Sequence, residues 1–266
     1  MELIQDDTDP RAATPDDARR IFRSGVNRTT SGWAEGFVQC NMLSVGPDVA
    51  RDVLVFAQRN PQACPVLDIL EPGQYSSAKF SGDIRTDLPG YVVYQQGKPP
   101  QLTNDMRDLW RDDYYTFLFG CSFTFENALR RHGIPLRHNE NGRTVPMYRT
   151  TLECAPAGVL RGPTVVTLRY IPGHMVAEAV RISARYPSSH GAPLHIGDPS
   201  EIGITNLGTP DWGDPPVSRE GDVPVFWACG VTPQAAVMGS SVNFALSHEP
   251  GRMAIMDISE ESLLVP

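Results

Sequence analysis

The sequence predicts an α/β protein with a three-layer open mixed sheet, helices on both faces, and a smaller inserted α/β lobe of two layers. Three observations lead to this fold class. A chain of 266 residues, 41% of them hydrophobic, can bury a large core. Strand-like and helix-like segments alternate along it. The region 143–215 differs in texture from its flanks, so we predict a main lobe of residues 1–142 and 216–266 with residues 143–215 inserted.

The amino-terminal elements follow from helix signals. Thr14 before Pro15 predicts a helix start, with Thr14 as the cap and acidic residues close to the positive end of the helix dipole. The apolar stripe in "GPDVARDVLVFAQRN" predicts a second helix over 46–60. "YVVYQQG", at 91–97, is typical of a strand that ends at a turn.

The next elements are a buried strand at 115–119 and a helix at 122–132, with Phe125, Ala128 and Leu129 on its inner face. The inserted region reads as strands "TVPMYRTTLE" and "TVVTLRYIP" followed by helix "GHMVAEAVRISARY". The last part returns to strand "VPVFWA", helix "TPQAAVMG" and two closing strands around "FALSHEPGRMAIMDI".

Charge and cysteine content limit the partners. The net charge is −8 and the 23 Lys and Arg residues are scattered, which argues against nucleic acid and anionic membrane. The first ten residues, "MELIQDDTDP", are acidic where a signal peptide is basic and then apolar, so we expect a cytoplasmic protein. Five widely spaced cysteines indicate reduced thiols rather than a disulfide framework.

Two stretches share one arrangement, an apolar strand followed by a cysteine beside a glycine and then a helix. They are "FLFGCSFTFE" with Cys121 and "VPVFWACGVTPQ" with Cys229. Such turns lie at the carboxyl ends of strands, where open α/β sheets bind ligands. A helix start favours thiolate and binds carboxylates. We therefore predict that Cys121 and Cys229 border one cleft at the carboxyl edge of a shared sheet and act in catalysis, with Ser122 and Gly230 beside them in substrate binding.

The same residues also have a purely structural interpretation. Free cysteine is often a small buried hydrophobic residue, and Ser122 is an ordinary helix-start residue. Glu126 is one position away from a capping box begun at Ser122, so it is a candidate general acid or base, although such a glutamate is more often solvated.

Several polar groups are candidates for the rest of a carboxylate site. "RTDLPGY" supplies Arg85 and Thr86 for a carboxylate and Asp87 for an ammonium group, or simply shapes a turn. On the strand "PMYRTT", Arg149 faces opposite to Tyr148 and Thr150, and it needs a partner if its face is buried.

The remaining candidates lie in three short stretches. "SSHGAPLHIGDP" contains His190, His195 and Asp198, whose spacing enforces no metal geometry, so the histidines are kept as acid–base groups and no metal is predicted. Asp198 is also a standard helix cap. Four further residues are either polar groups of a pocket or ordinary turn residues, namely Gln39, Asn41, His248 and Arg252.

Nine stretches in order resemble the D-glutamate cyclase family, also described as hydro-lyases. They run from about residue 17 to residue 258 and are "GFVQCN", "RNPQACPVLDILEPG", "RTDLPGY", "DLWRDD", "FLFGCSFTFE", "VPMYRT", "HGAPLHIGDP", "VPVFWACGVTPQ" and "SHEPGRM". The resemblance implies a two-lobed α/β protein that closes D-glutamate to 5-oxo-D-proline with loss of water. Cys40, Ala155 and Arg252 depart from the family pattern, which bears on the choice of substrate.

Other functions remain open from the residues alone. They are a hydratase or dehydratase for another small acid, a cofactor-free racemase that uses the cysteine pair, and a non-catalytic small-acid binding protein. We expect a small-molecule carboxylate as partner and no cofactor, because nucleotide, P-loop and zinc motifs are missing from the sequence. A homodimer is compatible with the sequence.

Overall fold

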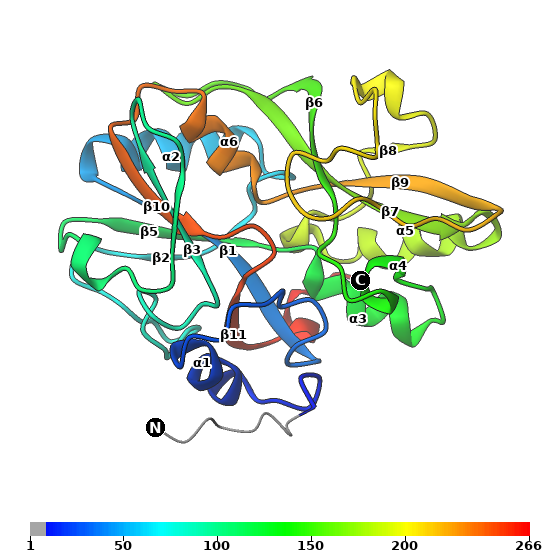
Figure 1. Cartoon of the computed structure of the whole chain (residues 1–266), viewed down its shortest axis with the longest axis horizontal. Coiled ribbons are helices and arrows are strands. Elements are labelled where there is room, and N and C mark those ends of the chain that lie inside the picture. Colours follow the sequence, from blue (N-terminus) through cyan, green and yellow to red (C-terminus); the bar gives the residue numbers. More distant parts are fainter. Residues whose placement is uncertain (1–8) are drawn as a thin grey trace.

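The structure is a computed structural model that describes residues 9–266 (Figure 1). The prediction about a signal peptide falls mainly on residues 1–8 and lies outside the described residues. Two sheets lie side by side, the first in the left half of Figure 1 and the second in the right half. The α/β fold class is confirmed.

The first sheet has the order β2-β5-β1-β10-β3-β4, and β11 pairs with β1. Its strands are β1 (Phe37–Val45), β2 (Val66–Leu70), β3 (Tyr91–Gln95), β4 (Gln101–Thr103), β5 (Tyr115–Gly120), β10 (Phe244–His248) and β11 (Ala254–Ser259). The second sheet has the order β6-β7-β9-β8. Its strands are β6 (Met147–Glu153), β7 (Pro163–Pro172), β8 (His195–Ile196) and β9 (Asp222–Ala228).

Every strand pair within residues 9–266 is antiparallel, so the predicted mixed sheet is wrong. The alternation of strands and helices had suggested parallel crossovers. However, α3 leaves the first sheet and packs on the second, so it does not return the chain to its own sheet in parallel.

Helices connect these strands. They are α1 (Pro15–Arg23), α2 (Pro47–Arg59), α3 (Phe123–Arg131), α4 (Arg137–Glu140), α5 (Val176–Ala184) and α6 (Thr232–Met238), with 3₁₀ turns η1 (Arg107–Leu109), η2 (Gly173–Met175), η3 (Pro187–Ser189), η4 (Pro199–Ile202) and η5 (Glu260–Leu263). The predicted start of α1 is confirmed, because Thr14 and Asp17 form a capping box ahead of Pro15.

Helix coverage of the first sheet is uneven. Helices α2 and α6 pack on the face that carries Phe117 and Phe119. The other face is covered largely by irregular segments that contribute Phe80 and Met106. Helix α1 packs against Ile255 of β11 in a separate cluster. This face lacks the helical layer that the sequence predicted.

The second sheet is covered on one face by α3 and α5, whose Phe125 and Ile182 pack with Trp227. Its other face carries Phe226 and is covered by the segment that contains Ile202. The predicted insert ended at residue 215, yet β9 (Asp222–Ala228) belongs to this sheet. The division into two lobes remains a prediction, with the second sheet extending to Ala228.

Candidate active site

The two cysteine turns repeat the same backbone hydrogen bonds. The amide of Thr124 donates to the carbonyl of Cys121 at 3.0 Å, and the amide of Thr232 donates to the carbonyl of Cys229 at 3.0 Å. The thiol of Cys121 accepts the amide of Phe123 at 3.4 Å. The amide of Val231, two residues after Cys229, likewise acts to lower the pKa of that thiol. Both cysteines thus start a helix in the same way.

The two threonines also lock their turns onto the neighbouring strand in the same way. The Thr124 hydroxyl accepts the amide of Gln39 at 3.2 Å, and the Thr232 hydroxyl accepts the amide of Val165 at 3.0 Å. Strand register agrees, since Gly120 pairs with Cys40 on β1 and Ala228 pairs with Val166 on β7. The strand, cysteine turn and helix therefore occur twice as one structural unit.

The turns meet at Asn41, although they belong to different sheets. The Asn41 amide donates to the carbonyl of Gly120 at 2.9 Å. The same amide fills the space of a missing side chain on Gly230, where a Cβ would lie 2.0 Å from Nδ2. The expectation that Cys121 and Cys229 share one sheet is wrong, because β5 and β9 lie in separate sheets. Their proximity comes from the packing of the sheets.

A buried ion pair lies beside both turns. Arg169 on β7 is 1% exposed, and its Nη2 and Nε lie 2.6 and 3.0 Å from Oε1 of Glu126. Nη2 also donates to Ser122 at 2.9 Å, and Nη1 donates to Thr167 at 3.2 Å. One N–H of Nη1 has no acceptor within residues 9–266. Arg169 is thus oriented by protein groups and keeps a donor for a ligand.

Glu126 is the anionic centre of this cluster. Its Oε1 lies 3.0 Å from Nε2 of His138, and its Oε2 lies 2.7 Å from the hydroxyl of Ser31. Burial alone would raise the pKa of Glu126, but Arg169, His138 and Ser31 outweigh burial and lower the pKa to about 2. Glu126 therefore stays ionised at neutral pH, so the geometry favours a carboxylate that positions Arg169 over a general acid. Ser122 likewise bonds Arg169 rather than capping its helix.

Both thiols are neutral at neutral pH. Burial raises the pKa of Cys121 well above its usual range, and the amide of Phe123 and the charge of Arg169 offset this only in part. Burial also raises the pKa of Cys229 to about 12, against the effects of Val231 and Arg169. The expectation of a partly ionised thiolate is wrong for this state, because each thiol is only 6% exposed and desolvation exceeds the effect of the helix start.

His190 packs against the first cysteine turn in a strained conformation. Its φ is +79°, in the left-handed region that non-glycine residues seldom occupy. A Cβ on Gly120 would lie 1.8 Å from the carbonyl oxygen of Ser188, so this segment touches the turn directly. Nδ1 donates to the Gln62 carbonyl at 2.8 Å, and Nε2 is buried without a partner among the described residues.

The protonation state of His190 follows from these contacts. Burial lowers its pKa to about 4, although the carbonyls of Gln62 and Gly120 favour the charged form. The imidazole is therefore neutral, with its proton on Nδ1 and a lone pair on Nε2. Nε2 can accept a proton.

The "RTDLPGY" residues lie in a different cluster. Arg85 pairs with Asp83 at 2.8 Å and lies 3.6 Å above the ring of Tyr75. Asp87 accepts hydrogen bonds from Arg23 and from the hydroxyl of Thr86. Asp87 thus anchors α1 to this turn, and its predicted ammonium partner is replaced by a guanidinium of the chain itself.

The strand residues of β6 make local contacts. Tyr148 donates to the carbonyl of Leu207 at 2.7 Å, and Thr150 donates to the carbonyl of Thr164 at 2.8 Å. Arg149 faces the other way, as predicted, and is 39% exposed. It pairs with Asp211 at 2.6 Å, so it already has the partner that the sequence argument required.

Three further candidates have local roles in the structure. Nε2 of His195 donates to the carbonyl of Asp198 at 2.7 Å, and the Asp198 side chain caps η4. His248 is fully buried and bonds Met42 and Gln234, and burial lowers its pKa to about 4. Within residues 9–266, no three His, Cys, Asp or Glu side chains are grouped closely enough to hold a metal ion.

An arginine-rich cavity of about 400 Å³ borders the ion-pair cluster. Ser31 and Asn139 line it, and the Ser31 hydroxyl contacts both Glu126 and Asn139 at 2.7 Å. Its other lining residues include Arg11, Arg28, Arg130 and Arg143. This cavity is an approach for an anionic ligand.

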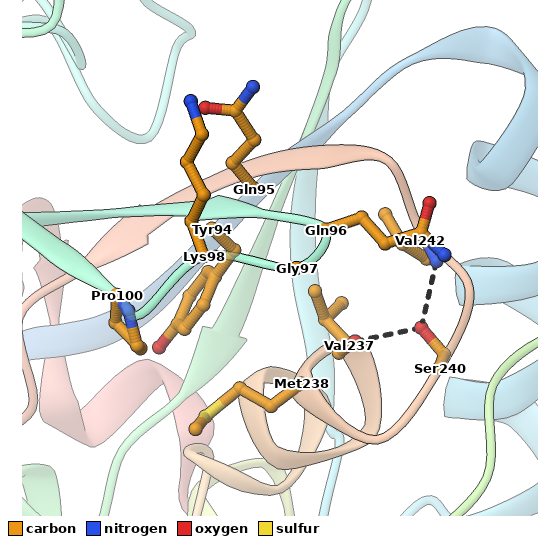
Figure 2. A pocket seen from close by; sticks show the side chains of 10 residues that line it. All are labelled: Tyr94, Gln95, Gln96, Gly97, Lys98, Pro100, Val237, Met238, Ser240 and Val242. Atoms are coloured by element: carbon orange, nitrogen blue, oxygen red, sulfur yellow. Dashed lines mark hydrogen bonds between the residues drawn. The ribbon is translucent and has the colours of Figure 1, made fainter.

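A smaller cavity of about 130 Å³ lies between the β3–β4 connection and the end of α6 (Figure 2). Tyr94, Pro100 and Met238 line it, while Lys98 and Gln95 extend away from Met238. Among its lining residues only Lys98 carries a charge. It lacks the acid and base groups that the cysteine turns supply.

Two residues of the site were not predicted from the sequence. Arg169 is the only charged residue in the strand "TVVTLRYIP", and a charge within an apolar strand is a signal for a buried ion pair or ligand site. His138 lies in "LRHNENG", which carries no motif.

Comparisons with known proteins agree with the motif pattern. The family model for D-glutamate cyclase matches residues 115–257. A protein of Saccharopolyspora erythraea is 54% identical over 95% of this chain and 100% of its own length. Proteins of Nocardioides sp. and Mycolicibacterium gilvum are 52% and 51% identical over 95% and 97% of this chain, and 94% and 99% of theirs. All three carry the name "Putative hydro-lyase".

One solved structure aligns over most of the chain. A nitrogen repressor-like protein from Methanococcus jannaschii covers 93% of it at a TM-score of 0.38 and 9% sequence identity. That degree of similarity carries no information about the site.

Proposed function

Because the chain belongs to the D-glutamate cyclase family, we propose that it is a hydro-lyase for a small amino or carboxylic acid, and that it closes D-glutamate to 5-oxo-D-proline. The observation that carries the proposal is the buried guanidinium of Arg169, held by Glu126 beside two thiols and a neutral imidazole. A guanidinium with a free N–H is a natural carboxylate partner.

The reaction needs one acid and one base. The amine must lose a proton before its nitrogen attacks the γ-carboxyl carbon, and the departing oxygen must gain protons to leave as water. Nε2 of His190 is the base in this scheme, because it carries a lone pair at neutral pH. Cys121 or Cys229 is the acid, since burial keeps both thiols protonated.

The C–N bond forms as the C–O bond breaks, and one water leaves. The protons released by the ammonium group balance those taken up by the leaving oxygen. No oxidant and no cofactor enters this balance.

The positive charge of the cavity that leads to the site also suits the acidic substrate of this family. The arginine-rich cavity next to Ser31 attracts anionic acids toward Glu126 and Arg169. Within residues 9–266 there is no helix with the length and apolar character needed to cross a bilayer. A cytoplasmic location remains part of the proposal.

The test is product formation from D-glutamate, measured by mass spectrometry as the loss of one water. The wild-type chain is expected to form 5-oxo-D-proline, and Arg169→Lys to lower kcat/KM by roughly 10–100-fold, the value of a hydrogen bond to a charged group. Arg149→Lys is the matched control, because Arg149 is exposed and already paired with Asp211. Turnover that survives Arg169→Lys unchanged, or binding of D-glutamate without water loss, contradicts the proposal.

A further inference from the structure

The arginine-rich cavity next to Ser31 carries more positive charge than an amino acid with one net negative charge would neutralise. The arginines that line it are Arg11, Arg28, Arg130 and Arg143. Asp9 also lines it, and Glu35 lies 3.5 Å from Nη1 of Arg130. Among residues 9–266, four positive and two negative charges leave a net charge of +2 around the cavity, on a chain whose own net charge is −8.

One donor of the cavity lining is not satisfied by the protein. Nη1 of Arg130 donates to Oδ1 of Asn127 at 3.1 Å, which holds the guanidinium against its own helix, α3. Nη2 of the same guanidinium is buried and has no hydrogen-bond partner in the described part of the chain. A buried donor without an acceptor is costly. A ligand in the cavity can supply the missing acceptor.

A second cavity lined by arginines lacks this feature. It has a volume of about 340 Å³ beside α5, and Arg131 and Arg181 are among its lining residues. Arg131 pairs with Glu260 at 2.6 Å, and Arg181 pairs with Glu178. These guanidinium groups already have acceptors from the chain, whereas Nη2 of Arg130 does not.

The lining of the arginine-rich cavity fits a phosphate group. A guanidinium donates two parallel N–H groups to phosphate oxygens. A phosphate group carries about −1.5 to −2 charges at pH 7, which matches the net charge around the cavity. Thr29, Ser31 and Asn139 add uncharged hydrogen-bonding groups to the lining. A volume of about 400 Å³ also leaves room for an organic group attached to the phosphate.

We propose that the arginine-rich cavity is a binding site for a phosphate group, carried by inorganic phosphate or by a small phosphorylated molecule. Nη2 of Arg130 donates to a phosphate oxygen, and the other arginines of the lining balance the charge. This site is separate from the proposed carboxylate site, because Arg169 does not line the cavity and is reached from it only through Ser31 and Glu126. The proposal does not depend on the proposed function.

Ser31 couples the phosphate site to the buried ion pair. Its hydroxyl lies 2.7 Å from Oε2 of Glu126 and 2.7 Å from Oδ1 of Asn139, yet it has a single proton to donate. A phosphate oxygen near Ser31 competes for that proton, and its charge repels the carboxylate of Glu126. A bound phosphate is therefore expected to weaken the contact that orients Arg169, and to oppose the approach of acidic substrates.

The experiment is isothermal titration calorimetry of the full chain at neutral pH, with the ionic strength held constant by sodium chloride. The probes are inorganic phosphate, O-phospho-L-serine and acetate. At least one phosphate probe is expected to bind to a single site, and acetate at least about 10-fold more weakly, because it has one charge and two oxygens. Tighter binding of O-phospho-L-serine identifies a phosphorylated molecule as the ligand, and tighter binding of inorganic phosphate identifies the free ion.

Two variants and a control locate the site. Arg130→Gln is expected to weaken phosphate binding by roughly 10–100-fold, because it removes the charge and the Nη2 donor. Arg11→Gln changes an exposed side chain of the same lining, so it tests the site even if Arg130→Gln does not fold, and several-fold weaker binding is expected. The matched control is Arg111→Gln, which removes an exposed guanidinium that pairs with Asp113 at 2.6 Å outside the cavity. It should bind phosphate as the wild type does.

The outcomes separate this proposal from the proposed function. No binding of either phosphate probe, equal binding of acetate, or equal losses in Arg130→Gln and Arg111→Gln would overturn the phosphate site. Binding that is lost in Arg169→Lys but kept in Arg130→Gln and Arg11→Gln would also overturn it, because the phosphate would then occupy the carboxylate site. Phosphate binding without water loss from D-glutamate supports the phosphate site and contradicts the proposed function, and water loss without phosphate binding does the reverse.

Discussion

Glu126→Gln is expected to remove most of the electrostatic support of the buried cluster. Each pKa unit corresponds to about 1.4 kcal/mol, so a shift from 4.5 to about 2 corresponds to about 3 kcal/mol of stability at neutral pH. Leaving a buried charge without its partner costs about 3–5 kcal/mol, which agrees. We therefore expect Glu126→Gln to lower the free energy of unfolding by about 3 kcal/mol at pH 7.

The pH dependence of this loss has a definite sign. A carboxyl group with a lowered pKa in the folded state stabilises fully above its unfolded pKa, here 4.5, and the stabilisation fades as the pH falls toward 2. The difference in the free energy of unfolding between wild type and variant should accordingly become smaller as the pH falls from 4.5 to 2. Urea unfolding followed by tryptophan fluorescence across this range measures it.

The matched control is Glu178→Gln. Glu178 also pairs with an arginine, Arg181, but both side chains are exposed on α5, where solvent screens the pair, so the variant should unfold as the wild type does. The reasoning is refuted if Glu126→Gln costs less than about 1 kcal/mol at pH 7, or if its effect is the same at acid and neutral pH.

Three further predictions concern catalysis, substrate approach and titration. Cys121→Ser should reduce turnover by 10²–10⁴-fold if the thiol transfers a proton, whereas an unchanged steady-state rate would make the thiol structural. Arg143→Gln, on the arginine-rich cavity, should raise KM several-fold for anionic substrates at low salt and leave kcat unchanged. This rise in KM should vanish at high ionic strength. A rise that does not depend on salt would contradict electrostatic attraction of the substrate by the cavity. His190 and His248, each with a pKa of about 4, should show constant imidazole NMR signals from pH 6 to 8. The free energy of unfolding should fall as the pH drops from 6.5 to 4, because the unfolded chain binds these protons more tightly. Titration of either ring near pH 6.5 would contradict the buried geometry.

Much of the fold could be predicted because its signals are local. The cap at Thr14, the apolar stripe of α2 and the strand before Cys121 each lie within a few residues, and all three elements form as predicted. Strand β1 could not be predicted in this way. It is buried on both faces, yet Gln39, Asn41 and Ser44 interrupt its apolar run.

Those polar residues have partners far away in sequence. Ser44 lies 2.7 Å from the hydroxyl of Thr116 on β5, and Asn41 reaches Gly120. A sequence pattern does not show which distant residues pair by hydrogen bonds. The polar residues of a buried central strand therefore make its sequence look like that of a loop.

The same reason limits prediction of the site. The cysteine turns were visible as two similar stretches, and the structure brings them together at Asn41. The sequence predicts Arg85 and Arg149 as anion sites, because neither segment has an obvious partner for its guanidinium. The structure gives each an aspartate, and the buried arginine that lies beside the cysteine turns is Arg169.

The Cys121 thiol is neutral, contrary to the prediction, because its desolvation by burial raises the pKa more than the start of α3 lowers it. Burial is a property of the tertiary structure, so only the direction of the local effect could be known from the sequence.

The central claim is that a carboxylate binds Arg169 between the two cysteine turns, and a crystal structure of the chain with 5-oxo-D-proline tests it most directly. We expect the carboxylate within hydrogen-bond distance of Nη1 of Arg169, with the ring beside the cysteine turns. A ligand bound instead at Arg149, or in the cavity beside Tyr94 and Met238, would contradict it.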